Sequence, residues 1–260
     1  MPRAKLPTVT LPDPREHPLA RRIRLAAQPD PEPARRPSFR RAIAELGGIA
    51  DPLRRPFRRI AVERAKNPAI VLVLPGFATR PAKMRYLAQH LERAGHTAKQ
   101  WGLGWNWGVD PGDLAQLEKR LQQICARYDS KIVLLGWSLG GLYARELAKR
   151  HPDCIAKVIT MGTPFSGSPR DNNVWRVYQF IAGHRVDLPP IEADLAAKPP
   201  VETVAFWSPM DGAIAPRSAA GRPGERDRAH ALRCTHIGFA QSPEAIRAIL
   251  AELDRAPAAD

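Results

Sequence analysis

From residue 68 onward, short apolar runs alternate with stretches of helical periodicity, and this alternation is what most constrains the fold. The apolar runs are strand candidates at residues 70–74, 97–101, 132–135, 156–160, 203–207 and 232–236. Strands separated by helices form crossover units, which lay parallel strands into one sheet with helices on both faces. The sequence therefore predicts an α/β domain with three layers and a mostly parallel sheet of about six strands.

Helix start signals and one long connection lie between these runs. Asp110 precedes Pro111 and Ser242 precedes Pro243, which is the order of a capping residue and a proline at the first helical position. The connection at residues 165–200 is long and carries Trp175 among charged residues. Because long connections inside a compact domain are commonly functional, we interpret residues 165–200 as a lid candidate.

The first 60 residues have a different composition. They hold 11 of the 27 prolines, and 14 Lys and Arg against 6 Asp and Glu. Residues 1–37 are therefore predicted to be a largely disordered basic tail, followed by one short amphipathic helix at 38–50. A chain of 260 residues is long enough for one large domain plus a tail. The predicted division is a Pro/Arg-rich tail at 1–60 and a folded domain at 61–260.

The formal net charge of +14 raises the question of polyanionic partners. No basic run contains the interleaved aromatic residues of single-strand binders, so we expect no nucleic-acid partner; nucleic-acid binding by the tail is a minor alternative. The basic tail is instead a candidate for peripheral contact with an anionic membrane. The longest strongly apolar stretch, residues 69–78, is too short to span a bilayer, and no secretory signal pattern is visible. We expect a cytoplasmic protein, with membrane contact that is at most peripheral.

One pentapeptide carries the strongest chemical signal. Gly136-Trp137-Ser138-Leu139-Gly140 matches the pattern GxSxG, and it stands between an apolar strand candidate and a helical pattern, as a nucleophile elbow requires. The glycines are expected because a side chain at either position would collide with neighbouring backbone in a sharp turn. Ser138 is therefore the predicted nucleophile.

A serine nucleophile needs an imidazole to accept its proton and a carboxylate to orient that imidazole. Of the seven histidines, only His236 lies just after a late strand candidate and before the final helix. Asp211 follows the fifth strand candidate, with Asp187 and Asp194 as weaker alternatives and a plain Asp-Gly turn as the competing interpretation. The order Ser138, Asp211, His236 is the one expected for an elbow of this kind.

Two backbone amides must stabilise the negative oxygen that develops on the substrate. We expect this oxyanion hole to use the amide of Leu139, directly after the serine, and the amide of Phe77, in the turn after the first strand candidate. A simple turn from strand to loop at Phe77 would have the same sequence. The assignment of Phe77 therefore depends on the serine elbow.

The segment at residues 101–108 is rich in tryptophan and glycine, but Trp107 stands where a dinucleotide fingerprint needs its third glycine. We interpret the segment as the wall of an apolar acyl pocket. A surface cluster of aromatic side chains packed under a loop explains the sequence equally well. The candidate substrate-binding residues are Trp105, Asn106, Trp137 and Trp175. The three cysteines lack ligand spacing and no metal or nucleotide motif is present, so no metal and no cofactor are predicted.

Four motifs together resemble the α/β-hydrolase superfamily and, within it, bacterial esterase and lipase-like proteins. They are PGF at residues 75–77, WGLG at 101–104, GWSLGG at 136–141 and GTPFSG at 162–167. The resemblance covers residues 68–253, implies the three-layer α/β-hydrolase fold, and implies a triad of Ser138, Asp211 and His236. The chain departs from the fullest form of that fold because no first and second strands are recognisable before residue 68.

The sequence thus indicates a serine hydrolase that cleaves carboxylic esters with an apolar acyl group, in a small molecule or a lipid, through an acyl-enzyme intermediate. A thioesterase, an amidase or an acyltransferase would use the same groups. The alternative from a different class is a non-catalytic scaffold of the same fold that binds lipid or a protein through its basic tail. The complete set of three groups argues against that scaffold, which has no need of them.

Overall fold

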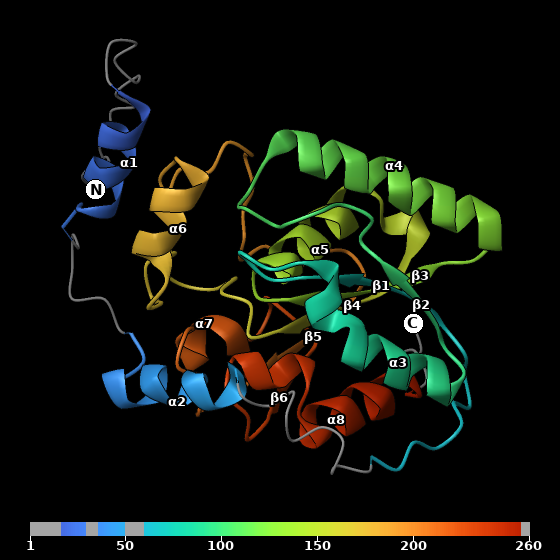
Figure 1. Ribbon diagram of the computed structural model, residues 1–260. Helices are drawn as coiled ribbons and strands as arrows, with labels where there is room; N and C mark the ends of the chain where they lie inside the picture. The colour runs from blue at the N-terminus through green and yellow to red at the C-terminus, as the bar shows by residue number, and fades with distance from the viewer. Residues whose placement is uncertain (1–16, 30–35, 50–59, 256–260) are drawn as a thin grey trace.

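A six-stranded sheet forms the centre of the computed structural model, which describes residues 17–29, 36–49 and 60–255 (Figure 1). The strands are β1 (Ile70–Leu74), β2 (Thr97–Gln100), β3 (Ile132–Trp137), β4 (Ile155–Met161), β5 (Glu202–Trp207) and β6 (Arg228–Ala231). They lie in the order β2-β1-β3-β4-β5-β6, and every neighbouring pair is parallel. The predicted α/β class and its parallel sheet of six strands are confirmed.

Helices cover both faces of this sheet (Figure 1). One face carries α4 (Pro111–Tyr128) and α5 (Leu139–Arg150), and the other carries α3 (Arg85–Ala94) and α8 (Pro243–Leu253). The shorter elements are α6 (Trp175–Ala182), α7 (Pro216–Ala220) and the 3-10 helices η3 (Pro81–Met84), η4 (Pro152–Cys154) and η5 (Ile237–Ala240). The predicted caps Asp110 and Ser242 are confirmed, because each side chain accepts an amide hydrogen bond in the first turn of its helix.

The core is divided by the sheet into two apolar layers. In β1, Val71 and Val73 pack with α3 and α8, whereas Leu72 and Leu74 pack with α4 and α5. Successive side chains of a strand point to opposite faces, so a strand covered on both sides must be apolar throughout. This explains why the apolar runs in the sequence identify the central strands well.

The sixth strand differs from the prediction of residues 232–236, because β6 spans Arg228–Ala231. β6 is an edge strand, and its Arg228 and His230 side chains form ion pairs with acidic residues. The apolar pattern that identifies a covered strand is therefore missing. Residues 232–236 instead form an irregular segment that ends at His236.

The predicted disordered tail contains a helix, so that prediction is wrong for the helical residues. Helix α1 (Pro18–Ala26) packs against α6 (Figure 1). Leu25 is buried in this contact, and its carbonyl accepts a hydrogen bond from the Gln179 side chain. Composition does not reveal a helix that is stabilised by a partner so far along the chain. The rest of the predicted disordered stretch, at residues 1–16 and 30–35, lies outside the described residues.

Helix α2 (Phe39–Ile49) confirms the short helix predicted at residues 38–50. The helix continues through Gly47 and Gly48. It packs against η5, close to the carboxyl edge of the sheet. Among the described residues, no helix combines the length and apolar character that crossing a membrane requires.

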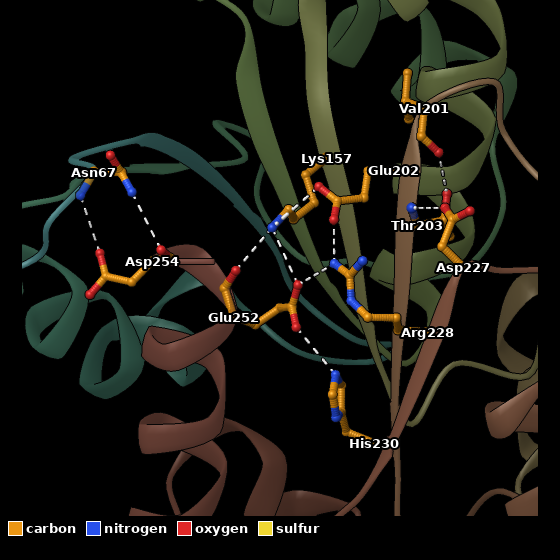
Figure 2. Close-up of polar contacts among 10 residues, drawn as sticks. All are labelled: Asn67, Lys157, Val201, Glu202, Thr203, Asp227, Arg228, His230, Glu252 and Asp254. Carbon is orange, nitrogen blue, oxygen red and sulfur yellow. Dashed lines mark hydrogen bonds and ion pairs between the residues drawn. The ribbon is translucent and has the colours of Figure 1, made fainter. Parts of the chain in front are cut away.

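Figure 2 shows a cluster of charged side chains at the amino ends of β4, β5 and β6. The ammonium of Lys157 lies 3.3 Å from a carboxylate oxygen of Glu202 and 3.2 Å from one of Glu252 in α8. Arg228 pairs with the same two glutamates, and His230 contacts Glu252 at 3.2 Å. The cluster joins three strands to the last helix.

Candidate active site

Ser138 occupies a sharp turn between β3 and α5, with φ 53° and ψ −122°. The neighbouring glycines have no room for a side chain. A Cβ on Gly136 would lie 2.4 Å from the Cα of Gly141, and a Cβ on Gly140 would lie 2.4 Å from the carbonyl oxygen of Leu74. The glycines predicted from crowding are thus explained by the geometry, and the turn presents Ser138 at the carboxyl edge of the sheet.

Asp211 and His236 meet at the same edge although they are distant in sequence. The Nδ1 atom of His236 lies 2.8 Å from the Oδ2 atom of Asp211. The other carboxylate oxygen of Asp211 accepts hydrogen bonds of 2.8 Å from the amides of Ala213 and Ile214. Both oxygens of a nearly fully buried carboxylate are therefore engaged, which fixes the imidazole and directs its Nε2 atom away from Asp211.

The surroundings of His236 favour its protonated form. Burial alone would lower the pKa of His236, but the Asp211 carboxylate, with a further contribution from Glu45, outweighs burial and raises the pKa. An imidazole with a raised pKa is a stronger proton acceptor, and its cation is stabilised once it forms.

Ser138 lines two cavities. The first has a volume of about 90 Å³ and a mainly apolar lining that includes Leu139, Leu142, Trp175, Tyr178 and Ile191. The second has a volume of about 760 Å³ and is lined by Ser138, His236 and Trp137 among others. Much of the apolar lining comes from residues 165–200, the segment interpreted as a lid. A molecule that bridges the two cavities would pass the Ser138 hydroxyl.

The two predicted oxyanion amides lie beside this serine. Phe77 lines both cavities, and Leu139 lines the apolar one. Within the described parts of the chain, neither amide donates a hydrogen bond outside the regular elements. Asn106 holds the turn that carries Phe77, because its side chain donates to the carbonyl of Pro75 at 2.8 Å and its own carbonyl accepts from Ala78 at 2.7 Å.

The four candidate substrate-binding residues have different positions. Trp175 is buried and lines the apolar cavity, whereas Trp105 is 39% exposed and lines the larger one. Trp137 lines the larger cavity and donates a hydrogen bond from Nε1 to the carbonyl of His236 at 3.0 Å. Asn106 is fully buried and, in the described structure, lines neither cavity, so its contact is with the turn.

The two alternative acids lie elsewhere. Asp187 pairs with Arg170 and Arg185, and Asp194 accepts hydrogen bonds from two amides in the following turn. Only Asp211 among the three is bonded to His236 in the described structure.

Two residues at the site escaped the sequence analysis. Gly162 has φ 55°, and a Cβ there would lie 2.9 Å from His236 Nδ1 and 3.0 Å from Asp211 Oδ2. The GTPFSG motif contains Gly162, so a signal for it existed. Glu45 in α2 accepts hydrogen bonds from the amides of His236 and Ile237, and no motif marked it.

The part of the chain that the structure describes holds no group of three or more His, Cys, Asp or Glu arranged to bind a metal ion. The three cysteines are free thiols.

Comparison with known proteins supports the fold. Residues 69–181 match the family described as the alpha/beta hydrolase fold. The chain is 45% identical over 47 residues to the biotin biosynthesis bifunctional protein BioHC of Teredinibacter turnerae, and 34% identical over 64 residues to the pimeloyl-[acyl-carrier protein] methyl ester esterase of Vibrio atlanticus. These segments cover 18% and 24% of this chain, and only 8% and 25% of the two relatives.

A solved structure extends the likeness over more of the chain. Aspergillus fumigatus lipase B superposes with a TM-score of 0.53 at 16% sequence identity, and the match covers 78% of this chain and 56% of the lipase. At this identity the likeness concerns the fold. The parallel sheet, the serine turn and the family match together identify the chain as a protein of the α/β-hydrolase fold.

Proposed function

We propose that this protein is a serine hydrolase that cleaves carboxylic esters with an apolar acyl group. The observation that carries the proposal is the position of Ser138, which lines one cavity together with His236 and a second, mainly apolar cavity. The relatives support the reaction class, since the matched protein from Vibrio atlanticus is named a methyl ester esterase. The ester substrate is a small molecule or a lipid.

In the proposed reaction, the Ser138 hydroxyl oxygen attacks the ester carbonyl and His236 accepts its proton at Nε2. The carboxylate of Asp211, 2.8 Å from Nδ1, stabilises the imidazolium. The amides of Phe77 and Leu139 donate to the oxyanion of the tetrahedral intermediate. The intermediate collapses to an acyl-enzyme, and the alcohol leaves with the proton from His236. Water, activated by His236, then releases the acid.

Residues 165–200 form the cap of this active site in the proposal, and residues 61–260 form the catalytic domain. The cap supplies Trp175, Tyr178 and Ile191 to the apolar cavity. An acyl chain held there would bury its own apolar surface, which is worth about 25 cal/mol per Å² removed from water. Selectivity for apolar acyl groups follows from this burial.

The test is a series of p-nitrophenyl esters from acetyl to palmitoyl, hydrolysed by the wild type and by Ser138→Ala. We expect turnover with an optimum in chain length, and a loss of at least about 1,000-fold in Ser138→Ala with an unchanged melting temperature. Hydrolysis retained by Ser138→Ala would contradict the mechanism. Covalent labelling of Ser138 without ester turnover would contradict the ester assignment and favour thioester, amide or acyl-transfer chemistry.

We further propose that the tail contacts an anionic membrane through α2. Phe39 is 79% exposed and Leu46 is 62% exposed, and Ile43 lies between them at helical spacing on the same side of the helix. Arg40 and Arg41 follow Phe39 in the same helix and are exposed, so the helix combines apolar and cationic groups as interfacial helices do.

Vesicle flotation of the full chain tests this contact. We expect the protein to float with phosphatidylglycerol vesicles, to stay behind with phosphatidylcholine vesicles, and to lose binding about tenfold in a Phe39→Ser, Leu46→Ser double variant. Binding should weaken as salt is raised, because the arginines contribute through screened charge. Equal flotation with both lipids, or none, would contradict the proposal.

A further inference from the structure

The side chain of Glu45 enters the candidate active site from α2. One carboxylate oxygen of Glu45 accepts hydrogen bonds from the amide of His236 at 2.6 Å and from the amide of Gly212 at 2.9 Å. The other oxygen accepts from the amide of Ile237 at 3.0 Å. A single carboxylate thus joins the turn of Asp211 to the turn of His236.

The backbone of α2 is fitted closely to the same two turns. A Cβ on Gly212 would lie 2.2 Å from the carbonyl oxygen of Arg41, and a Cβ on Gly48 would lie 2.9 Å from the Cβ of Ile237. The Gln241 side chain donates to the carbonyl of Gly48 at 2.7 Å. Close contact on both sides of Glu45 shows a built interface rather than a chance approach of one flexible side chain.

The three amides need this acceptor. They belong to loops beyond β5 and β6 that lack ladder partners, and a partly buried amide without an acceptor destabilises the fold. The amides of His236 and Ile237 stand at the start of the 3-10 helix η5, where the first amides have no acceptor within the helix.

Glu45 also acts on the charge of His236. The charged groups facing the imidazole are Asp211 from the turn after β5 and Glu45 from α2. The neighbouring rings are those of Trp137 and Phe239, which are neutral. Two carboxylates therefore favour the imidazolium that forms when the serine gives up its proton.

We propose that Glu45 is a positioning residue for His236 and Asp211, so that the N-terminal segment completes the active site of this chain. The inference rests on the proposed hydrolase function. It assigns a role to a helix outside residues 69–181, the part that matches the family. The side of α2 that carries Glu45 faces the site, whereas Phe39, Ile43 and Leu46 remain exposed.

The main test compares Glu45→Gln with Ala44→Gln, which places the same side chain on an exposed position of the same helix. We expect Glu45→Gln to lower kcat about 10- to 100-fold with KM changed less than about threefold, because misplaced catalytic groups slow the chemical step rather than binding. Ala44→Gln should match the wild type. Loss confined to KM, or equal effects of both variants, would overturn the proposal.

The pH profile supplies a readout that a merely structural role would not move. Removing the Glu45 charge destabilises the imidazolium and lowers the pKa of His236. Because hydrolysis needs the neutral imidazole, the acid limb of kcat/KM should move to lower pH in Glu45→Gln. An acid limb identical to that of the wild type would overturn the electrostatic role.

Titration of the His236 ring by nuclear magnetic resonance separates this inference from the proposed function. The His236 pKa should fall in Glu45→Gln and stay unchanged in Ala44→Gln, whether or not the protein hydrolyses the chosen esters. If the wild type shows no hydrolysis, the proposed function fails. An active wild type with an unshifted His236 pKa and normal kcat in Glu45→Gln contradicts the role of Glu45.

A second variant covers the case in which Glu45→Gln folds poorly. Glu45→Asp keeps the charge but is shorter by one methylene, so it reaches fewer of the three amides. We expect Glu45→Asp to have a lower kcat than the wild type, but the same acid limb in the pH profile of kcat/KM. A kcat equal to that of the wild type in Glu45→Asp would contradict the proposal that the length of the Glu45 side chain positions His236 and Asp211.

Discussion

The two ends of the sheet both hold buried charged groups, but the groups are balanced differently. At the amino ends, Lys157 and Arg228 face Glu202 and Glu252, so two cations meet two carboxylates (Figure 2). At the carboxyl ends, the Asp211 and Glu45 carboxylates face the imidazole of His236, and Ser138 lines the same cavity as His236. The first arrangement joins three strands to a helix, whereas the second places an excess of negative charge around His236.

This difference suggests that the charges at the amino ends act on the stability of the fold, and those at the carboxyl ends on the proposed reaction. In the cluster at the amino ends, each charged side chain already has a partner of opposite charge. Transfer of a proton within the cluster would therefore not stabilise it. Around His236 the negative charges are in excess, so protonation of the histidine is favoured, and in the proposed mechanism the serine supplies that proton. Variants at the two ends should therefore affect different measurements.

Asp211→Asn is expected to have the largest effect. An amide cannot stabilise the imidazolium or keep the same tautomer, so kcat should fall about 10,000-fold while the fold is retained. Steady-state ester hydrolysis and circular dichroism measure the two quantities. Asp187→Asn, which changes an acid paired with Arg170 and Arg185, is the control and should stay within about threefold of the wild type. A similar loss of kcat in Asp211→Asn and Asp187→Asn would contradict a specific role of Asp211.

Lys157→Met should show the opposite pattern at the amino ends. Removing the cation leaves Glu202 and Glu252 to share Arg228, and breaking a buried ion pair costs about 3 kcal/mol of unfolding free energy. Urea denaturation measures this loss. The activity per folded molecule should remain within about twofold, and a selective fall in kcat would show that the two ends are coupled.

Gly162→Ala tests how tightly the His236 and Asp211 pair is enclosed. The added Cβ would meet both side chains, so we expect kcat to fall about 10- to 100-fold. Gly224→Ala is the matched control, because Gly224 also has a positive φ, of 88°, but opens onto free space. Both variants strain the backbone, and only Gly162→Ala should lose activity. Equal activity in Gly162→Ala and Gly224→Ala would contradict an effect of the collision with His236 and Asp211.

The smallest expected effect is the pH dependence of Glu252. Burial opposes its ionisation, but Arg228 and Lys157 outweigh burial and lower its pKa in the folded protein. A lowered pKa stabilises the fold above the unfolded value of about 4.3, and this contribution is lost as the pH falls through the folded pKa. The gap in unfolding free energy between the wild type and Glu252→Gln should therefore narrow below about pH 4.3. A constant gap, measured with urea, would contradict this.

Local signals were sufficient for much of the fold, and they also marked the three residues proposed as the catalytic groups. The serine turn, the acid after β5 and the histidine before the last helix each stand in a local pattern, and the shared carboxyl edge of a parallel sheet brings them together. β6 was misplaced because an edge strand built on Arg228 and His230 has no apolar run. Helix α1 and Glu45 were missed because their roles depend on contacts with residues more than 100 positions away.

The most direct test of the account is covalent labelling with a fluorophosphonate probe, followed by mass mapping of the adduct. The wild type and Ser138→Ala are treated in parallel, with Asp211→Asn as a third sample. We expect one adduct, on Ser138, which is absent in Ser138→Ala and forms more slowly in Asp211→Asn. A folded wild-type protein that takes up no probe at Ser138, or takes it up equally in all three samples, would contradict the assignment of this site.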